Sequence, residues 1–286
     1  MNIEAGNCGA AGSPVGAYSV LMSVYAGDHA DWLGASLESM AKQTVAPTEI
    51  VLVFDGPLGD DLLAVIDTFG TAHPGLLVRV PLAQNHGLGL ALNEGIPHCT
   101  TDVVMRMDAD DLSMPSRCGK QLAKLAEGYD MVGCNISEFS NDPEHPNAER
   151  IMPEGNEDVV RFAHQRAPFV HPTFAVRKQA LIDVCGYRSV SYAEDYDLFV
   201  RLIRAGYKGC NIQESLLRVR VDEGAYRRRG GLSYLRSMLS FNVLQLREGW
   251  FSPLDFLRRS LANSVVALMP NGVRDAIYKH LLRRRS

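Results

Sequence analysis

Short apolar runs that alternate with helical segments constrain the fold of this chain more than any other feature. The runs predicted as buried strands span residues 18–25, 49–54, 76–81, 103–107 and 129–134. The helices predicted between them span 32–42, 61–69, 89–96 and 115–127, the first of them capped by Asp31. Strands and helices that alternate in this way build βαβ units, so the sequence predicts an α/β fold whose mostly parallel sheet is flanked by helices.

Beyond residue 135 the alternation weakens. Residues 140–153 are polar, contain three prolines and are predicted as an excursion loop, whereas 157–165, 178–185 and 194–205 are predicted as helices. From Arg227 onward the chain is basic and helical. We therefore expect three parts: a flexible leader at 1–16, an α/β domain at 17–225 and a basic helical segment at 226–286.

The net charge of −4 conceals a division between the two ends of the chain. Residues 1–199 carry 12 Lys/Arg and 27 Asp/Glu, and residues 200–286 carry 17 and 6, which gives −15 and +11. One apolar stripe at helical spacing accompanies the basic end: Leu254, Leu257, Leu261, Val265 and Leu268. Two interpretations remain open, namely packing of the stripe on the catalytic domain and attachment to an anionic membrane surface.

Other classes of protein are disfavoured by composition. The sequence contains no apolar stretch long enough to predict a membrane-spanning helix. Its six cysteines form no CxxC pair, and its histidines form no HxxxH, so reduced thiols and no zinc site are expected. No partner nucleic acid is expected either.

Three carboxylates, those of Asp108, Asp110 and Asp111, follow the strand predicted at 103–107. Like charges crowded at the end of a buried strand are unfavourable unless a cation neutralises them, and Mg²⁺ sites combine carboxylates with substrate phosphates. The alternative is a solvated acidic turn or a cap ahead of the next helix. The parallel-sheet context favours the metal site, because ligands bind at the carboxyl ends of such strands.

Two more segments follow predicted strands at the same edge. Asp55 can accept hydrogen bonds from a nucleoside, although Asp-Gly-Pro is also an ordinary turn. Asn85 and Gly87 belong to a glycine-containing segment that lacks the third glycine of a dinucleotide fingerprint, since that position is Leu92. Gly87 is better explained as a close approach of backbone to a phosphate or as tight packing against the sheet.

Further along the chain, Glu194 and Asp195 open a predicted helix. They are either a helix start, which favours acids, or a general base facing the cleft. His171, in a proline-containing loop, is either a structural residue or part of an acceptor site.

These segments, taken together and in this order, resemble the family 2 glycosyltransferases. The resemblance covers residues 18 to 225 and rests on Met22-Ser23-Val24-Tyr25, Gln43-Thr44, Asp55-Gly56, Asn85-x-Gly87-x-x-x-Ala91-x-Asn93-x-Gly95, Asp108-Ala109-Asp110-Asp111 and Glu194-Asp195. The chain looks closest to the amylovoran-type enzymes of bacterial exopolysaccharide assembly. That likeness rests on Pro168-Phe169-Val170-His171-Pro172-Thr173, Glu194-Asp195-Tyr196-Asp197-Leu198 and Arg228-Arg229-Gly230-Gly231.

The resemblance implies a GT-A fold over 17–225 and transfer of a hexose from a nucleotide-diphosphate sugar, a UDP-hexose. It places Tyr25 and Asp55 on the nucleoside, with Asn85 and Gly87 at the same donor site. The chain departs from its relatives in one respect, because Phe54 stands where an acidic pair is common and only one carboxylate remains there.

The resemblance also assigns the chemistry. Asp108 and Asp110 would be the DxD pair, which binds the donor and a divalent cation, Mg²⁺ or Mn²⁺, with Asp111 beside them. Asp195 would be the general base of an inverting transfer, with Glu194 next to it.

The remaining expectations concern the acceptor. His171, Arg228 and Arg229 are candidates for binding the acceptor or a diphosphate. The acceptor implied is a saccharide linked to polyprenyl diphosphate, met by a cytoplasmic protein at the inner face of the cytoplasmic membrane. A catalytically silent scaffold and a sugar nucleotidyltransferase are the alternative functions. The sugar, the linkage and the choice between Mg²⁺ and Mn²⁺ are not specified by the sequence.

Overall fold

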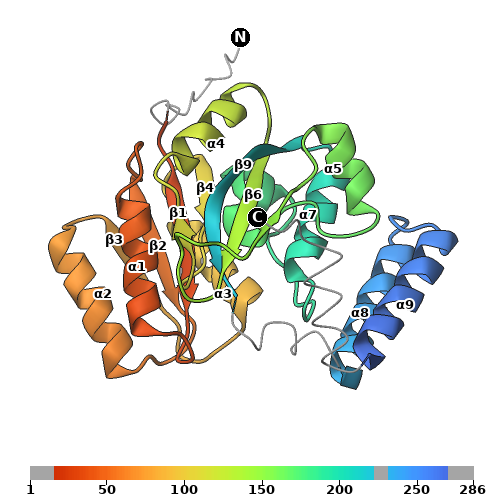
Figure 1. Ribbon diagram of the computed structural model, residues 1–286, viewed down its shortest axis with the longest axis horizontal. Helices are drawn as coiled ribbons and strands as arrows, with labels where there is room; N and C mark the ends of the chain where they lie inside the picture. Colours follow the sequence, from red (N-terminus) through yellow and green to blue (C-terminus); the bar gives the residue numbers. More distant parts are fainter. Residues whose placement is uncertain (1–15, 222–230, 270–286) are drawn as a thin grey trace, which may run out of the picture.

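A computed structural model of the protein describes residues 16–221 and 231–269 (Figure 1). The predicted leader, apart from Gly16, lies outside the described residues, as do Arg228 and Arg229.

One nine-stranded sheet forms the centre of the described structure, with the order β3-β2-β1-β4-β8-β6-β9-β5 and with β7 paired to β6. The strands are β1 (Ser19–Val24), β2 (Glu49–Phe54), β3 (Leu77–Pro81), β4 (Val103–Arg106), β5 (Leu112–Ser113), β6 (Met131–Phe139), β7 (Ala148–Arg150), β8 (Ala175–Arg177) and β9 (Gly209–Arg220). Strands β3, β2, β1 and β4 are parallel, and so are β6 and β9. The expected GT-A-like α/β fold is confirmed, and antiparallel pairings of β8, β7 and β5 extend it.

Helices cover both faces of the sheet. The helices of the described residues are α1 (Ala30–Ala41), α2 (Asp60–Ala72), α3 (Leu88–Gly95), α4 (Arg117–Ala126), α5 (Asn156–Ala163), α6 (Lys178–Asp183), α7 (Glu194–Arg204), α8 (Gly231–Arg247) and α9 (Pro253–Leu268), with short 3-10 turns at Ile96–His98 and His171–Thr173, and α1 to α7 are the ones that pack on the sheet. One apolar core joins the sheet to α1, α2 and α4. The other joins it to α3, α5, α6 and α7, so the domain has three layers.

Four strands were not expected from the sequence. Strand β7 lies inside the segment predicted as an excursion loop, where Ile136–Glu138 of β6 pair with it. The long strand β9 runs parallel to β6, with a register shift near Asn135. Two helix starts differ from the expected ones by two residues: His29, not Asp31, is the N-cap of α1, and α4 begins at Arg117 rather than at Pro115.

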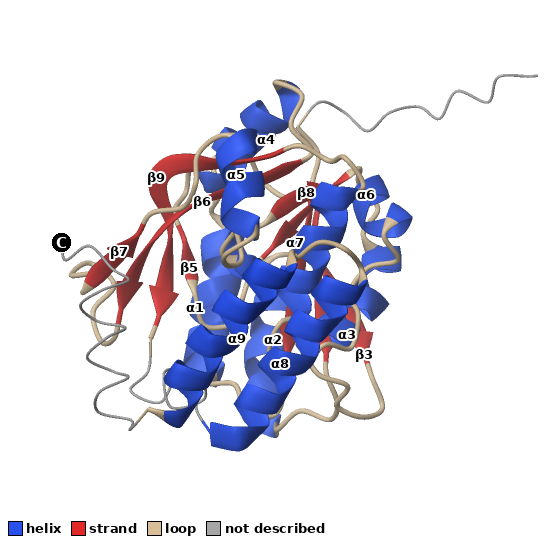
Figure 2. Ribbon diagram, turned by 90° about the vertical axis from the view of Figure 1, so that its right-hand side faces the viewer, coloured by secondary structure: helices blue, strands red, loops and turns tan. Residues whose placement is uncertain are grey.

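The C-terminal helices α8 and α9 form a hairpin at the opposite end of the molecule from α2 (Figures 1 and 2). Helix α8 buries Met238 and Phe241 against α7. By contrast, the apolar stripe of α9 is exposed, since all five of its residues exceed half exposure. The interpretation in which this stripe packs on the catalytic domain is therefore wrong. Among the residues that the structure describes, no helix is long and apolar enough to cross a membrane.

Candidate active site

The candidate site lies where parallel strands end. The register pairs Val24 of β1 with Phe54 of β2, and Leu21 of β1 with Arg106 of β4. The segments after these strands therefore meet at one edge of the sheet, as expected of a ligand site in an α/β fold.

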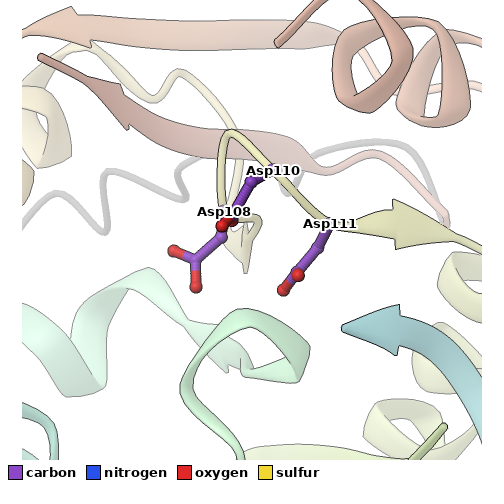
Figure 3. Close-up of side chains that lie close together, drawn as sticks. All are labelled: Asp108, Asp110 and Asp111. Atoms are coloured by element: carbon purple, nitrogen blue, oxygen red, sulfur yellow. The ribbon is translucent and has the colours of Figure 1, made fainter. Parts of the chain in front are cut away.

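The acidic loop, residues 108–111, brings three carboxylates together (Figure 3). Oxygen atoms of Asp108, Asp110 and Asp111 all lie within 4.8 Å of one another. Asp111 is 1% exposed, and its Oδ1 accepts a hydrogen bond from the backbone N–H of Arg220 at 2.9 Å. Its Oδ2 is buried and has no hydrogen-bond partner among the described residues. An orphaned carboxylate oxygen inside an acidic cluster is the chemistry that a hard divalent cation satisfies.

The pKa values of these carboxylates also indicate that the loop would bind a cation. Burial, reinforced by the charge of Asp108, raises the pKa of Asp110 to about 6. Burial also raises the pKa of Asp111 well above its ordinary value, with Asp108 and then Asp110 adding to the effect. A cation bound by these carboxylates would stabilise their charged forms. The residues present therefore fit a divalent ion.

Arg106 is a buried counter-charge that the sequence analysis did not single out. Its guanidinium pairs with Oδ1 of Asp108 and donates to the carbonyl of Met107, and the residue is only 2% exposed. Its Nε is buried without a partner among the described residues. An arginine that ends a buried strand directly before an acidic loop was the available signal.

Arg220, at the end of β9, is a second residue that the sequence analysis missed. Its Nε donates to the carbonyl of Asp110 at 3.3 Å, and its guanidinium carbon lies 4.5 Å and 4.6 Å from the ring centroids of Trp32 and Phe139. Together with its backbone bond to Asp111, these contacts fix the acidic loop from the side of β9.

The donor residues expected at the end of β2 lie together. Both oxygens of Asp55 accept backbone hydrogen bonds, from His86 at 2.6 Å and from Gly87 at 3.0 Å, and Asn85 Nδ2 donates to the Asp55 carbonyl at 3.2 Å. Gly56 has φ of 92°, and a Cβ there would meet the Asn85 nitrogen at 2.9 Å. Asp55 thus holds the shape of the 85–87 loop, in addition to any contact with a nucleoside.

Tyr25 follows β1 and is 48% exposed, so its ring is accessible to a ligand. Its backbone N–H donates to Asp28 at 3.0 Å. Burial raises the pKa of Asp28. The hydrogen bond from the Tyr25 backbone lowers this pKa, and the charge of Asp108 raises it further. Asp28 therefore belongs to the same acidic corner as the loop at 108–111.

The expected base residues occupy the first turn of α7. Burial raises the pKa of Glu194, whose side chain packs beside Gly89 at the start of α3. Oδ1 of Asp195 accepts the backbone N–H of Tyr196 at 2.7 Å. The Glu194 side chain therefore lies next to the start of helix α3.

Tyr187 connects the base residues with the acidic loop. Burial raises its pKa, and the charges of Asp195, Asp108 and Glu194 raise it further, whereas Arg106 opposes them. The charges of Asp108, in the acidic loop, and of Glu194 and Asp195, on α7, therefore all act on the Tyr187 hydroxyl.

His171 is buried, at 8% exposure, and its Nε2 lies 2.8 Å from the Tyr187 hydroxyl. Burial, with a smaller contribution from Arg106, lowers its pKa well below the ordinary value. The imidazole is thus held neutral beneath the site, and a direct contact with an acceptor stays a prediction.

Comparison with known proteins decides the family. The model of Glycosyl transferase family 2 matches residues 19–186, which include β1 to β4 and the acidic loop. The chain belongs to glycosyltransferase family 2. Two relatives match nearly its whole length. The amylovoran biosynthesis glycosyltransferase AmsE of Erwinia amylovora is 35% identical over 92% of this chain and 98% of its own. The UDP-Gal:alpha-D-GlcNAc-diphosphoundecaprenol beta-1,3-galactosyltransferase of Escherichia coli is 32% identical over 93% and 97%.

A solved structure supports the fold of this family 2 glycosyltransferase. The mannosyltransferase PcManGT of Pyrobaculum calidifontis, in complex with GDP-Man and Mn²⁺, aligns with a TM-score of 0.63 at 18% identity. The alignment covers 87% of this chain and 69% of that one. At this identity the likeness establishes the GT-A architecture alone.

Proposed function

We propose that this family 2 enzyme transfers a hexose, with inversion, from a UDP-hexose to a saccharide on polyprenyl diphosphate during synthesis of a bacterial surface polysaccharide. The observation that carries the proposal is the acidic loop with its orphaned Asp111 oxygen, together with the charges of Asp108, Glu194 and Asp195 that all act on Tyr187. The donor and acceptor classes are suggested by the E. coli relative, whose name specifies UDP-Gal and a diphosphoundecaprenol-linked sugar.

In this proposal the acidic loop holds a divalent cation through Asp110 and Asp108. When bound, the cation stabilises the negative charge that develops on the departing diphosphate. Arg106 keeps Asp108 in place by pairing with Oδ1, and Arg220 fixes the Asp110 carbonyl. Mg²⁺ and Mn²⁺ both suit carboxylate oxygens. The exposed ring of Tyr25 and the Asp55-supported loop contact the nucleoside.

Asp195 acts as the general base. As the acceptor oxygen attacks the anomeric carbon, its O–H proton passes to the Asp195 carboxylate, the bond from that carbon to the diphosphate breaks, and UDP leaves. Attack from the face opposite the leaving group inverts the anomeric centre. Burial raises the pKa of the neighbouring Glu194, so its charged form is less favoured than that of an exposed glutamate.

The hairpin supplies the membrane contact of the proposal. Five apolar side chains of α9 are more than half exposed, and the segment from residue 200 onward carries a net charge of +11. Basic segments near anionic lipid gain roughly 1 kcal/mol per Lys or Arg, and an apolar helix face adds its buried area. A peripheral position on the inner face of the cytoplasmic membrane would bring the enzyme to a lipid-linked acceptor.

The proposal is tested with the purified full chain, a panel of UDP-hexoses and a polyprenyl-diphosphate sugar in vesicles. We expect free UDP and an extended glycolipid from one donor, an inverted anomeric configuration by NMR, and loss of product after chelation that Mg²⁺ or Mn²⁺ restores. Family membership favours glycosyl transfer over the nucleotidyltransferase alternative. Absence of product with every donor would instead support the silent scaffold.

A further inference from the structure

The carboxylate of Asp197, on α7, is completely buried two residues after Asp195. Two hydrogen bonds satisfy it: Nε of Arg201 donates to Oδ2 at 2.7 Å, and Nε2 of Gln245 donates to Oδ1 at 3.1 Å. A nitrogen of Arg188 lies farther away, at 3.8 Å from Oδ1. Because a buried carboxylate needs such partners, these contacts determine where α7 can lie.

On one side, the network reaches the hairpin. Gln245 of α8 is itself completely buried, so its amide is fixed on Asp197. Phe241, one turn earlier on α8, packs on Tyr196 with ring centroids 4.9 Å apart. Arg204 of α7 donates to Oε2 of Glu248, just after α8, at 2.9 Å. The hairpin and α7 are therefore held together by apolar, neutral polar and charged contacts.

On the other side, the network reaches the active site. The two terminal nitrogens of Arg201 donate to the carbonyls of Val184 and Gly186. This turn leads into Tyr187, whose backbone exchanges two hydrogen bonds of 2.8 Å with the side chain of Asn93 on α3. The Tyr187 hydroxyl in turn contacts the buried His171. Arg201 therefore stabilises the turn that positions Tyr187 beside His171.

We propose that Asp197 is a positioning residue that fixes the start of α7, and with it Glu194 and Asp195, against the hairpin and the 184–187 turn. The inference rests on the proposed function, because it assumes that Asp195 is the base. Without the Asp197 charge, the hydrogen bond from Gln245 loses its charged acceptor and Arg201 loses its charged partner. A shift of about 1 Å in a catalytic group can cost about 10²-fold in rate.

The primary test replaces Asp197 by Asn in the full chain. We expect the kcat for transfer to fall between about 10-fold and 10²-fold, while the donor dissociation constant stays within about twofold, because the donor contacts lie on other elements. Asp183→Asn is the matched control, since this exposed aspartate of α6 bonds only Tyr207 and Gln179 among the described residues. Its kcat should equal that of the wild type.

A rescue variant separates positioning from a general loss of packing. In Asp197→Asn with Gln245→Glu, the negative charge moves to the other side of the same 3.1 Å hydrogen bond. We expect this double variant to recover most of the lost kcat. If Asp197→Asn alone does not fold, Gln245→Met provides the test, with a fall of about threefold to tenfold expected.

Two kinetic results would overturn the proposal. One is a wild-type kcat in the variant that folds, and the other is a loss of kcat matched by an equal loss of donor affinity without recovery in the double variant. Hydrogen exchange of residues 193–199, measured without substrate, should quicken in Asp197→Asn and slow again in the double variant. This readout needs no turnover, so failure of the proposed function leaves it intact, whereas unchanged exchange rejects the positioning role.

Discussion

The acidic loop and the α8–α9 hairpin depart from the usual distribution of residues in opposite ways. The loop buries carboxylates, one of them with an unsatisfied oxygen, whereas the hairpin exposes five large apolar side chains in one stripe. Each arrangement costs free energy in the protein alone. In our proposal both regions are completed from outside, the loop by a cation and the hairpin by a lipid surface.

The largest effect is expected at the acidic loop. Asp110→Asn should lower turnover by about 10³-fold or more, because a bound metal contributes several kcal/mol to stabilising transition-state charge. Isothermal calorimetry with Mn²⁺ should show weakened binding. Asp142→Asn, on an exposed loop, is the control and should change neither measurement.

Asp110→Asn also tests how much stability the protein loses by burying the Asp110 carboxylate. Because the pKa of Asp110 is raised to about 6, the folded state holds a proton that the unfolded state releases between about pH 4 and 6. The metal-free wild type should therefore lose stability as the pH rises through this window, and Asp110→Asn should melt higher than the wild type at pH 7. Equal melting temperatures at pH 7 would show that the loop carries no such cost.

The second effect concerns the base. Asp195→Asn should reduce transfer by about 10² to 10⁴-fold and keep donor affinity, since a positioned base contributes that much. Single-turnover kinetics together with donor titration would measure both quantities. Activity within about threefold of wild type would move the role to Glu194, for which Glu194→Gln is the next variant.

A smaller effect is expected at the hairpin. Leu257→Glu or Leu261→Glu should weaken binding to anionic vesicles by about tenfold, since each leucine contributes roughly 1.5 to 3 kcal/mol when fully buried. Ile182→Glu, which replaces an exposed apolar residue of α6, should not. Co-sedimentation at low salt measures the binding, and high salt should release the protein.

Point variants are better suited to this test than removal of residues 250–286. Phe251 belongs to the apolar cluster against α7, and the Arg259 guanidinium lies 5.0 Å from the Tyr196 ring centroid. Truncation would therefore disturb the helix that carries Asp195. If the point variants bind anionic vesicles as the wild type does, the apolar stripe is not the membrane contact.

The smallest effect separates the formation of α9 from its exposure. Ser252 caps α9 in a capping box, in which its hydroxyl accepts from the Asp255 N–H at 3.1 Å. Ser252→Ala should cost about 1 kcal/mol in local stability and should leave transfer unchanged. Hydrogen exchange of the first turn of α9 measures the loss. Ser264→Ala, inside the same helix, is the control with a smaller expected change.

Most of the N-terminal half was predictable because its signals are local. The strand at 49–54 was predicted with its observed bounds. The C-terminal half of the sheet was not, because β9 alternates weakly between buried and exposed residues and forms only through pairing with β6 and β5. Long-range pairing of this kind leaves little trace in a short window of sequence.

The sequence by itself determined the α/β class, the family and the acidic loop, because periodicity and ordered motifs depend on neighbours along the chain. Only the tertiary structure decided that Arg106 and Arg220 enclose this loop, that Asp55 supports the 85–87 backbone and that the apolar stripe is exposed. The physical reason is that burial and charge pairing arise between residues far apart in sequence. Asp197 illustrates this, since its partner Gln245 follows 48 positions later.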